Sequence, residues 1–555
     1  LTTAVFQLES RGLKEYLVKI KPSSFEDIIS VVALYRPGPL DAGMVDTFIK
    51  RKHGSEKTDY LGDKDIEKVL KNTYGVIVYQ EQVMQLAQEY SGFSLGQADL
   101  LRRAMGKKIP EEMERQRPEF IKGALKKGKI ERAAEGLFDQ IQTFAGYGFN
   151  KAHSAGYGLI AFQTAWLKAH YPVEFLSAAL SSDMDDSDRV RLLLDDCKNF
   201  EIDILKPDVN KSQLNFVNQG DNEILYGLGA VKGLGKAAIE NIISEREQKP
   251  FENLYDFCAR VDLSKVDKRG IEPLIKCGAM DSFNLSRKEM LESLEDAMKY
   301  AKQNTMTQES GISDLFGGIS ESNDFIPVKK DKYDDFANSK FEFSALGFYL
   351  ETHPVKEHYW ELKKLGTGSI ENVMEERVNT ISGVIIRQNR IQTRRGPLVF
   401  ATLDDGTDRI ELVISSEVLD SFEGNLNPQT IYIASGDVTF EKDTQKKNIG
   451  LQKKMRVTDI KSLEEARMKS VTKLKINIEG QEKKDVLDIV ENLKAIALIE
   501  NNTQGSQIEM QYNLNSGSAN IELDKDFRIL LNDDNMDKLV ENCGKENIDF
   551  QYRAR

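Results

Sequence analysis

LLRRAMGKKIPEEM (Leu100–Met113) and FAGYGFNKAHSAGYGLIAFQTAWLKAHYP (Phe144–Pro172) are two stretches of similar composition. Each places a cluster of cations beside flexible glycines and a run of helix-forming residues. A polyphosphate site needs fixed positive charge, close backbone approach and a rigid support. The two stretches therefore predict a helical region of the chain that binds a nucleotide.

Helical periodicity extends this interpretation to residues 1–205. Apolar residues recur at helical spacing through residues 79–90, 112–123 and 152–170, and turn-forming sequences such as RPGPL (36–40) separate them. We expect Asn150 to cap the last of these helices and Pro172 to end it. One face of that helix is expected to be buried and carries Leu159, Phe162, Trp166 and Ala169.

A glycine-rich motif lies in a second helical region, LYGLGAVKGLGKAAIENII (Leu225–Ile243). Its turn, Gly233 to Gly235, is followed by Lys236 and an Ala-rich helix, which is the helix-hairpin-helix pattern. Glycines free the turn so that backbone N–H groups can meet a DNA phosphate at a helix N-terminus. Such a contact reads the DNA backbone and not the bases. The alternative is a glycine-rich turn used only for packing.

Residues 370–460 change to the period of strands, with TISGVIIRQ, LVFATLDD, RIELVIS, TIYIASGDVTF and NIGLQ as five short strands. Five such strands suit an OB barrel, which binds single-stranded nucleic acid with cations and stacking aromatics. The cations on or after the first strand are Arg387, Arg390, Arg394 and Arg395. The aromatics are few: Phe400, Tyr432 and Phe440. A purely structural barrel with a solvated charged loop is the alternative.

Two further regions complete the chain. The polar stretch 303–340 reads as a linker, interrupted by the apolar insert SDLFG (313–317). Large apolar side chains in such a setting are typical of a peptide that docks into a pocket, and local packing is the alternative. Residues 466–555 mix strand-like pieces with a helix near 482–495 and predict a small α/β domain.

Composition describes a multidomain protein. The 555 residues carry a net charge of −13, but residues 1–170 hold 25 Lys and Arg against 21 Asp and Glu. The first part is therefore net positive, which is compatible with nucleic-acid binding. Four dispersed cysteines indicate neither structural zinc nor disulfides, and suggest a reducing cytoplasm. No apolar run is long enough to span a bilayer, so we expect no membrane association.

A catalytic carboxylate set is not evident in the sequence. DMDDSD (183–188) contains Asp-x-Asp, but it precedes a helix, so we expect it to cap that helix. Asp404-Asp405-Gly406 is expected to form a hairpin turn. No Ser/His/Asp triad or P-loop pattern is present, and we predict neither a catalytic residue nor a metal ligand in this chain.

Long motifs resemble the bacterial replicative DNA polymerase III alpha subunit family. They are VFQLESRG (5–12), ALYRPGPLDAGMVDTFIKRKHG (33–54), TYGVIVYQEQVMQLAQ (73–88), LLRRAMGKK (100–108), FAGYGFNKAHSAGYG (144–158) and, further on, LGFYLETHP (346–354). The resemblance implies a multidomain α+β fold with five parts. They are fingers (1–205), a tandem helix-hairpin-helix domain (206–310), a clamp-binding peptide and linker (311–369), an OB domain (370–465) and a C-terminal domain like the tau-interaction part (466–555).

The resemblance also implies roles for particular residues. Arg102 and Arg103 would contact the triphosphate of the incoming nucleotide, with Lys151 and His153 in the same pocket. Paired arginines suit a leaving pyrophosphate because each guanidinium can bind two oxygens. The alternative is an ion-paired helix face, since two glutamates follow at 111–112.

Further binding residues are expected in the other domains. DNA contacts are assigned to Gly233, Gly235, Lys236, Arg387, Arg394 and Arg395. Clamp contacts are assigned to Asp314, Leu315 and Phe316, although Ile312 stands where the family commonly has glutamine.

The family's catalytic aspartates lie in a palm that precedes the fingers, and no position here matches them. The chain thus resembles the C-terminal half of the subunit; its start at Leu1 suggests lost upstream residues. We expect Mg²⁺ to be bound by the missing palm, and this chain alone not to extend a primer. A non-catalytic DNA-binding and clamp-tethering protein, or an accessory mutagenic paralogue, are the alternatives.

The partners implied are primer–template DNA, deoxynucleoside triphosphates, the sliding clamp (beta) and the clamp-loader tau subunit. A proofreading exonuclease would bind through the missing N-terminal region.

Overall fold

The computed structural model describes residues 1–106, 110–144, 147–283, 285–310, 335–351, 353–375, 377–394, 396–422, 426–428, 430–442, 451–479, 489, 491, 493, 505–514, 517–522 and 528–553. The chain divides into two compact units, which are described separately. The first comprises Leu1–Leu274, Ala297–Gly311 and Asp443–Gly450, and the second comprises Ile275–Asp296, Ile312–Lys442 and Leu451–Arg555. This division is coarser than the five expected domains, whose boundaries stay predictions.

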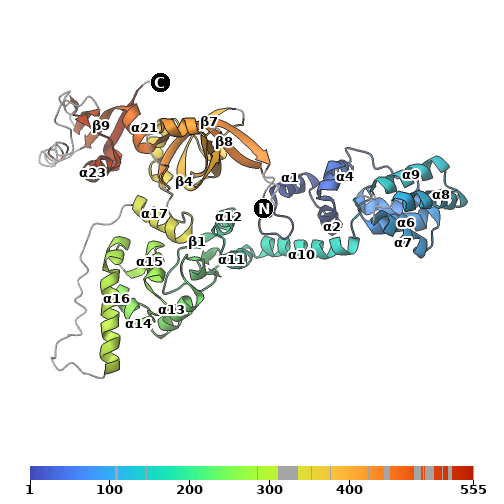
Figure 1. Cartoon of the computed structure of the whole chain (residues 1–555), viewed down its shortest axis with the longest axis horizontal. Helices are drawn as coiled ribbons and strands as arrows, with labels where there is room; N and C mark the ends of the chain where they lie inside the picture. The colour runs from blue at the N-terminus through green and yellow to red at the C-terminus, as the bar shows by residue number, and fades with distance from the viewer. Residues whose placement is uncertain are drawn as a thin grey trace. The chain divides into compact units, whose positions relative to one another are not determined.

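The first unit begins with helices in two hydrophobic clusters (Figure 1). One cluster is built around α1 (Arg11–Ile20), α2 (Phe25–Leu34) and α4 (Met44–Lys52). The other is built by α5 (Lys64–Leu70), α6 (Gln80–Ser91), α7 (Leu95–Gly106), α8 (Pro110–Lys126) and α9 (Glu131–Phe144). A short helix, α3 (Pro37–Asp41), covers the RPGPL sequence.

A long helix, α10 (Lys151–His170), follows and packs against α2. Asn150 caps it as expected, because its side chain accepts the N–H of His153 at 2.8 Å. Near its other end Lys168 is buried, donates to the Thr3 carbonyl at 2.6 Å and pairs with Asp196. These contacts fix α10 between the N-terminal segment and α12 (Ser187–Lys198).

The buried face of α10 differs from the prediction. Its covered positions include Ser154, Gly158, Ala161 and Lys168, whereas Leu159, Phe162, Trp166 and Ala169 are exposed. Close packing on α2 is the physical reason: Gly158 lies against Ile29, and the Ser154 hydroxyl donates to the Ile29 carbonyl. Small residues allow that approach, and large apolar ones do not.

The rest of the first unit runs from α11 (Pro172–Ser182) to the helix-hairpin-helix region. Asp186 caps α12 by accepting the N–H groups of Asp188 and Arg189, which confirms the capping role expected of DMDDSD. A small sheet, β1 (Asp203–Leu205), β3 (Glu223–Leu225) and β2 (Val217–Asn218), was not predicted, because strands of two or three residues show no alternation. The helices after it are α13 (Lys236–Gln248), α14 (Leu254–Arg260) and α15 (Lys268–Lys276), of which the last two residues belong to the second unit.

The second unit contains a closed barrel with strand order β4-β5-β6-β8-β7. Its strands are β4 (Val378–Thr393), β5 (Gly396–Asp404), β6 (Arg409–Ile414), β7 (Ile431–Lys442) and β8 (Leu451–Ser462). The five-stranded barrel confirms the OB prediction, and the Asp404–Gly406 turn joins β5 to β6. Of the fifth expected strand, NIGLQ (448–452), Leu451 and Gln452 begin β8, and residues 448–450 lie outside the described residues.

Helices before the barrel and a small sheet after it complete the second unit. The helices are α16 (Arg287–Ser310, which crosses the unit boundary), α17 (Asp335–Leu346), α18 (Pro354–Glu357) and α19 (Tyr359–Lys364), with α20 (Ser416–Ser421) between β6 and β7 and α21 (Leu463–Ser470) after β8. The C-terminal part contains β9 (Val471–Glu479), β10 (Ser506–Leu514), β11 (Gly517–Glu522), β12 (Arg528–Ile529), α23 (Asp533–Cys543) and β13 (Ile548–Tyr552). Its sheet has the order β11-β10-β9-β13, with β12 paired to β10, which confirms a small α/β domain. Most of the helix expected near 482–495 lies outside the described residues.

A buried ion pair ties the C-terminal part to the helices before the barrel. Arg467 on α21 donates to Glu361 on α19 at 2.7 Å, and both side chains are almost fully buried. Arg467 also donates to the carbonyl of Leu531 and to Asp533. In the second unit, buried polar contacts of Arg467 therefore hold these segments together in addition to the hydrophobic clusters. Within the described parts of the chain, no helix is long and apolar enough to cross a membrane.

Candidate nucleotide and nucleic-acid interface

Arg102 and Arg103 lie on α7 and share one carboxylate. Arg102 Nη2 lies 2.8 Å from Asp99 Oδ1, and Arg103 Nε lies 2.7 Å from Asp99 Oδ2. The hydrogen bond from Arg102 and the charges of both arginines lower the pKa of Asp99. The Asp99 side chain is 29% exposed and that of Arg103 is 63% exposed, so solvent screens these pairs and a stronger anion could compete for the arginines. A triphosphate could replace Asp99, because phosphate oxygens offer the same bidentate geometry with more charge.

Gln80 connects α7 to the second glycine-rich stretch. Its Oε1 accepts a 3.4 Å hydrogen bond from Arg102 Nη1, and its Nε2 donates to the Gly148 carbonyl at 3.3 Å. The backbone N–H of Gln80 donates to the Phe149 carbonyl at 2.8 Å. Gln80 is the first residue of α6, so the start of one helix holds both stretches in place. Arg102 is thereby brought to the segment that leads into α10.

The start of α10 gathers the other predicted nucleotide-binding residues. Lys151 pairs with Glu26 at 3.1 Å and lies 5.4 Å from the centre of the Tyr79 ring. Its backbone N–H donates to Glu81 Oε2 at 2.8 Å. Because a helix N-terminus attracts anions, the Glu81 carboxylate occupies a position that would also suit a phosphate.

His153 lies in the first turn of α10 and takes part in a row of rings. Its ring centre lies 5.5 Å from that of Phe149 and 4.6 Å from that of Tyr157. Tyr157 in turn contacts Phe6 at 5.4 Å. His153 and Tyr157 are exposed, so a flat ligand could reach the middle of this row.

Arg36 is a residue of the same region that sequence reasoning did not single out. Its guanidinium donates to the carbonyls of Tyr147 and Ala33 and lies 4.3 Å from the centre of the Phe149 ring. Burial lowers its pKa. Beside it, Gly38 contacts the Tyr147 ring so closely that a Cβ would overlap the ring. The RPGPL sequence was treated above only as a turn-forming sequence. It could have indicated that Arg36 belongs to the site, since it places a cation beside a glycine that allows close approach.

The helix-hairpin-helix glycines have the geometry that the motif requires. Gly233 has φ of 82°, in the left-handed region that favours glycine. Gly235 precedes α13, and no side chain caps that helix. A Cβ at Gly235 would meet nothing within 4 Å, so this side of the turn is open. Lys236 is largely exposed and lies 3.8 Å from Glu240. A similar turn contains Gly278, with φ of 80°, at the end of α15.

The barrel places its arginines on the exposed end of β4. Arg387 pairs in register with Thr402 and Arg390 with Val399 on β5, while Arg394 lies in the turn that follows. Of the three aromatics considered for stacking, Tyr432 is buried and its hydroxyl accepts the Asn427 N–H, so it belongs to the core. Phe440 packs against the same core, and Phe400 is half-buried.

Some predicted residues lie outside the described part of the chain. They are Arg395, Asp314, Leu315 and Phe316, together with Lys107 and Lys108 of the basic cluster. Within the described residues, no group of three or more His, Cys, Asp or Glu side chains is arranged to hold a metal ion.

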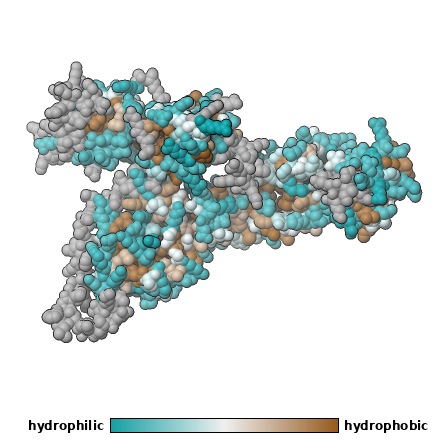
Figure 2. Space-filling model, viewed as in Figure 1, coloured by the Kyte–Doolittle hydropathy of each residue, from teal (hydrophilic) through white to brown (hydrophobic). Residues whose placement is uncertain are grey.

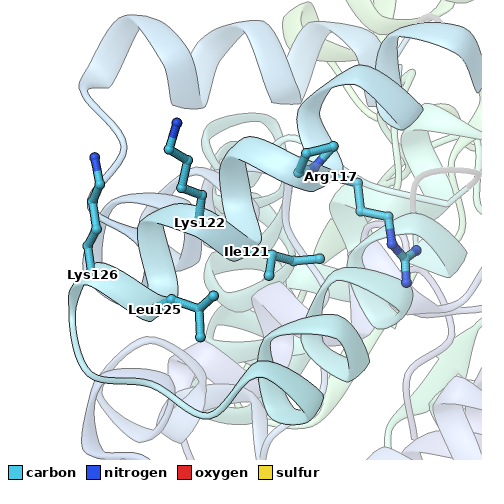
Figure 3. Close-up of a pocket in the computed structure, with 6 residues that line it drawn as sticks. Arg117, Ile121, Lys122, Leu125 and Lys126 are labelled. Carbon is cyan, nitrogen blue, oxygen red and sulfur yellow. The ribbon is translucent and has the colours of Figure 1, made fainter.

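A hollow of about 650 Å³ lies along α8, where Figure 3 shows Lys122 and Lys126 extending their amines in the same direction. Ile121 and Leu125 supply apolar surface, and Arg117 pairs with Asp139 on α9. The hollow thus combines cationic and apolar surface on the same unit as Arg102.

Sequence profiles of three domains match the chain. They are the bacterial DNA polymerase III alpha subunit finger domain (residues 1–128), a helix-hairpin-helix motif (201–290) and an OB-fold nucleic acid binding domain (380–463). Together with the helices and the closed barrel described above, they define the class: a multidomain protein that combines a polymerase finger domain, a helix-hairpin-helix motif and an OB fold.

Curated relatives identify the family. The chain is 39% identical over 565 residues to DNA polymerase III subunit alpha of Pasteurella multocida and 40% identical over 566 residues to that of Vibrio cholerae. These alignments cover 100% and 99% of this chain and 48% of each relative. The Escherichia coli K12 subunit is 41% identical over 499 residues, which cover 88% of this chain and 42% of that protein. The chain belongs to the bacterial DNA polymerase III alpha subunit family, and it corresponds to the C-terminal region of that subunit.

The chain thus spans about half the length of the curated relatives it matches. Among solved structures, an asparaginyl-tRNA synthetase of Entamoeba histolytica, in complex with asparaginyl-adenylate, aligns with 18% of this chain and 23% of its own at 19% identity. The TM-score of 0.15 is too low to support any argument.

Proposed function

We propose that this chain is the part of a template-directed DNA polymerase that binds the incoming nucleotide and the DNA. The observation that supports it most is the set of hydrogen bonds by which Gln80 links Arg102 to the segment that leads into α10. It joins the two cation- and glycine-rich stretches of the sequence in one region of the first unit. The relatives named above, all polymerase alpha subunits, support the same function.

In this proposal the arginines bind the triphosphate of a deoxynucleoside triphosphate. Arg102 and Arg103 exchange Asp99 for phosphate oxygens and stabilise the charge that develops on the departing pyrophosphate. Gln80 acts as a positioning residue, since it orients the Arg102 guanidinium. Lys151 and His153 contribute charge and a stacking ring from the start of α10.

DNA is bound by the other two predicted surfaces. The turn at Gly233–Gly235 presents the uncapped start of α13 and Lys236 to a duplex phosphate. Arg387 and Arg394, with Arg395, provide cations on the barrel for the single-stranded template. None of these contacts reads a base edge, so binding is independent of DNA sequence.

Chemistry is completed outside this chain. Mg²⁺, held by carboxylates of the uncovered half of the family's subunit, would activate the primer hydroxyl and neutralise phosphate charge. The SDLFG peptide, through Asp314, Leu315 and Phe316, tethers the polymerase to the sliding clamp, and the C-terminal domain joins the clamp-loader tau subunit. The proofreading exonuclease binds elsewhere on the subunit, and the assembly works in the cytoplasm.

Photochemical labelling tests the nucleotide site. The uncovered part of the Vibrio cholerae subunit is joined in front of Leu1 to give a fused protein with primer–template bound. A deoxynucleoside triphosphate with a photoreactive group on its γ-phosphate is then added and crosslinked. We expect the label on peptides from α7 or from the start of α10, and an excess of the unmodified nucleotide should reduce this labelling. Specific labelling confined to other peptides would refute it.

A further inference from the structure

The helix α10 is apolar on nearly all sides, yet only one of its faces is covered. A helix of this composition is normally buried all round. In the first unit its covered positions include Ser154, Gly158, Ala161 and Lys168, which face α2, the N-terminal segment and α12. The larger apolar side chains of the helix point away from these contacts.

Four exposed side chains form a continuous apolar strip, which we call the α10 ridge: Phe25, Leu159, Phe162 and Trp166. Their exposed fractions are 39%, 47%, 42% and 44%. Phe25, from the start of α2, meets Phe162 edge to face at 5.8 Å between ring centres. Trp166 lies 4.5 Å from His170 between ring centres, in a tilted arrangement, and also contacts Tyr171, so it continues the strip. Figure 2 shows hydrophobic surface over the part of the molecule that α10 occupies.

The ridge has the character of an interface. Single exposed apolar residues are ordinary on protein surfaces, but contiguous sets of them mark contact sites. Aromatic residues, and Trp above all, supply much of the binding energy at such sites. The ridge joins two helices and includes three aromatic rings. It is therefore a contiguous apolar set and not a single exposed residue of the ordinary kind.

We infer that the α10 ridge is the docking surface for the half of the polymerase subunit that this chain does not cover. The chain spans 48% of its relatives' length, so a comparable mass of protein belongs beside it. α10 also begins with Lys151 and His153, two residues of the proposed nucleotide site. The polypeptide that completes that site must approach this helix, and the ridge runs along it. This inference rests on the proposed function for the choice of partner.

Oxidative footprinting compares the ridge in two proteins. The first is this chain alone, and the second is the protein in which the uncovered part of the Vibrio cholerae subunit is fused in front of Leu1. Hydroxyl-radical oxidation of Phe162 and Trp166 is measured by mass spectrometry. In the fused protein we expect both oxidation rates to fall by at least about fivefold, as for side chains at the desolvated centre of an interface. Leu192 on α12, which is 46% exposed, serves as the internal control and should not change.

Other occupants of the ridge would overturn the inference. Equal oxidation of the ridge in both proteins does so directly. Protection that appears in the chain alone with rising concentration would identify a second copy, and protection already present in dilute chain would identify its own second unit. Primer extension by the same fused protein is recorded separately. Extension with an unprotected ridge refutes only this inference, whereas protection without extension refutes only the proposed function.

Substitutions give a second measurement. Phe162→Ser and Trp166→Ser should lower the thermal midpoint of the fused protein by clearly more than that of the chain alone, because only the fused protein also loses an interface at the ridge. Leu192→Ser should have the same effect on both proteins. If the ridge variants also affected both proteins alike, the ridge would have no partner in the fused half.

Discussion

Arg102 and Gln80 are joined by a hydrogen bond of 3.4 Å between Nη1 and Oε1, although 22 residues separate them. Gln80 also binds the carbonyls of Gly148 and Phe149, so one side chain and its backbone N–H link α7 to the entry of α10. The proposed nucleotide site depends on this link, because it brings the arginines near Lys151 and His153.

Removing Arg103 should weaken nucleotide use in the fused protein. Loss of charge-assisted hydrogen bonds worth about 1.5–3 kcal/mol predicts a decrease in kcat/KM of about tenfold to a hundredfold for Arg103→Ala. The decrease appears as a raised KM for nucleotide or a lowered kcat in steady-state primer extension. Arg132→Ala, an exposed arginine on α9, is the matched control. Unchanged KM and kcat in Arg103→Ala would remove Arg103 from the site.

Substitution in the helix-hairpin-helix turn should change the salt dependence of DNA binding. Lys236→Ala removes one phosphate contact, so duplex affinity should fall for all sequences alike and the slope of log K against log salt should decrease by about 1. Fluorescence anisotropy with two duplexes of unrelated sequence measures both. Lys249→Ala provides the control, because Lys249 follows the far end of α13 and pairs with Glu252. An unaltered slope for Lys236→Ala would show that this turn does not contact DNA.

The SDLFG peptide should be required for clamp binding. The double variant Leu315→Ala and Phe316→Ala removes both large apolar side chains and should abolish capture of the chain by immobilised sliding clamp. Glu321→Ala, in the same linker but outside the insert, should be captured like the wild type. Equal capture of the double variant would count against the tether.

Glu342 on α17 should make stability depend on pH. Burial raises its pKa to about 7, against the opposing effect of hydrogen bonds from the N–H groups of Leu350 and Glu351. The folded protein therefore retains a proton that the unfolded chain releases near pH 4.5. Between these values the folded state binds more protons, so the unfolding free energy falls as pH rises, by up to about 3 kcal/mol. Above about pH 7 the Glu342 carboxyl is ionised in both states, so it no longer makes the unfolding free energy depend on pH.

The variant Glu342→Gln should remove this dependence, since an amide oxygen can accept the same N–H groups without ionising. Denaturant titrations between pH 4.5 and 8 measure the effect, and the variant should be the more stable protein at pH 8. Glu417→Gln on the exposed face of α20 is the control. A variant that keeps the wild-type pH slope would contradict the assignment to Glu342.

Much of the fold could be predicted because local patterns agreed with it. The alternating strands predicted the barrel, and Asn150 and Asp186 fulfilled the capping roles expected of their positions. The fifth strand includes the end of the predicted NIGLQ sequence, since Leu451 and Gln452 pair with Lys442 and Glu441 of β7. It then continues well beyond that sequence, to Ser462.

The buried face of α10 could not be predicted from spacing alone. An all-round apolar helix offers several faces, and close contact with Ile29 selects the one with Gly158 and Ser154. In the site, the arginines were evident from their clustering and family resemblance, but their shared partner Asp99 was not. Gln80 and Arg36 were missed because their contacts cross 68 and 111 residues of sequence.

Primer extension tests most directly whether this chain supplies the nucleotide and DNA binding of a polymerase. Template-directed incorporation of nucleotides with Mg²⁺ is measured for this chain alone and for the protein with the uncovered Vibrio cholerae part fused in front of Leu1. We predict no extension by the chain alone and template-dependent extension by the fused protein. Extension by the chain alone, or none by a fused protein that folds and binds primer–template, would contradict the assignment of nucleotide and DNA binding to this half of a polymerase.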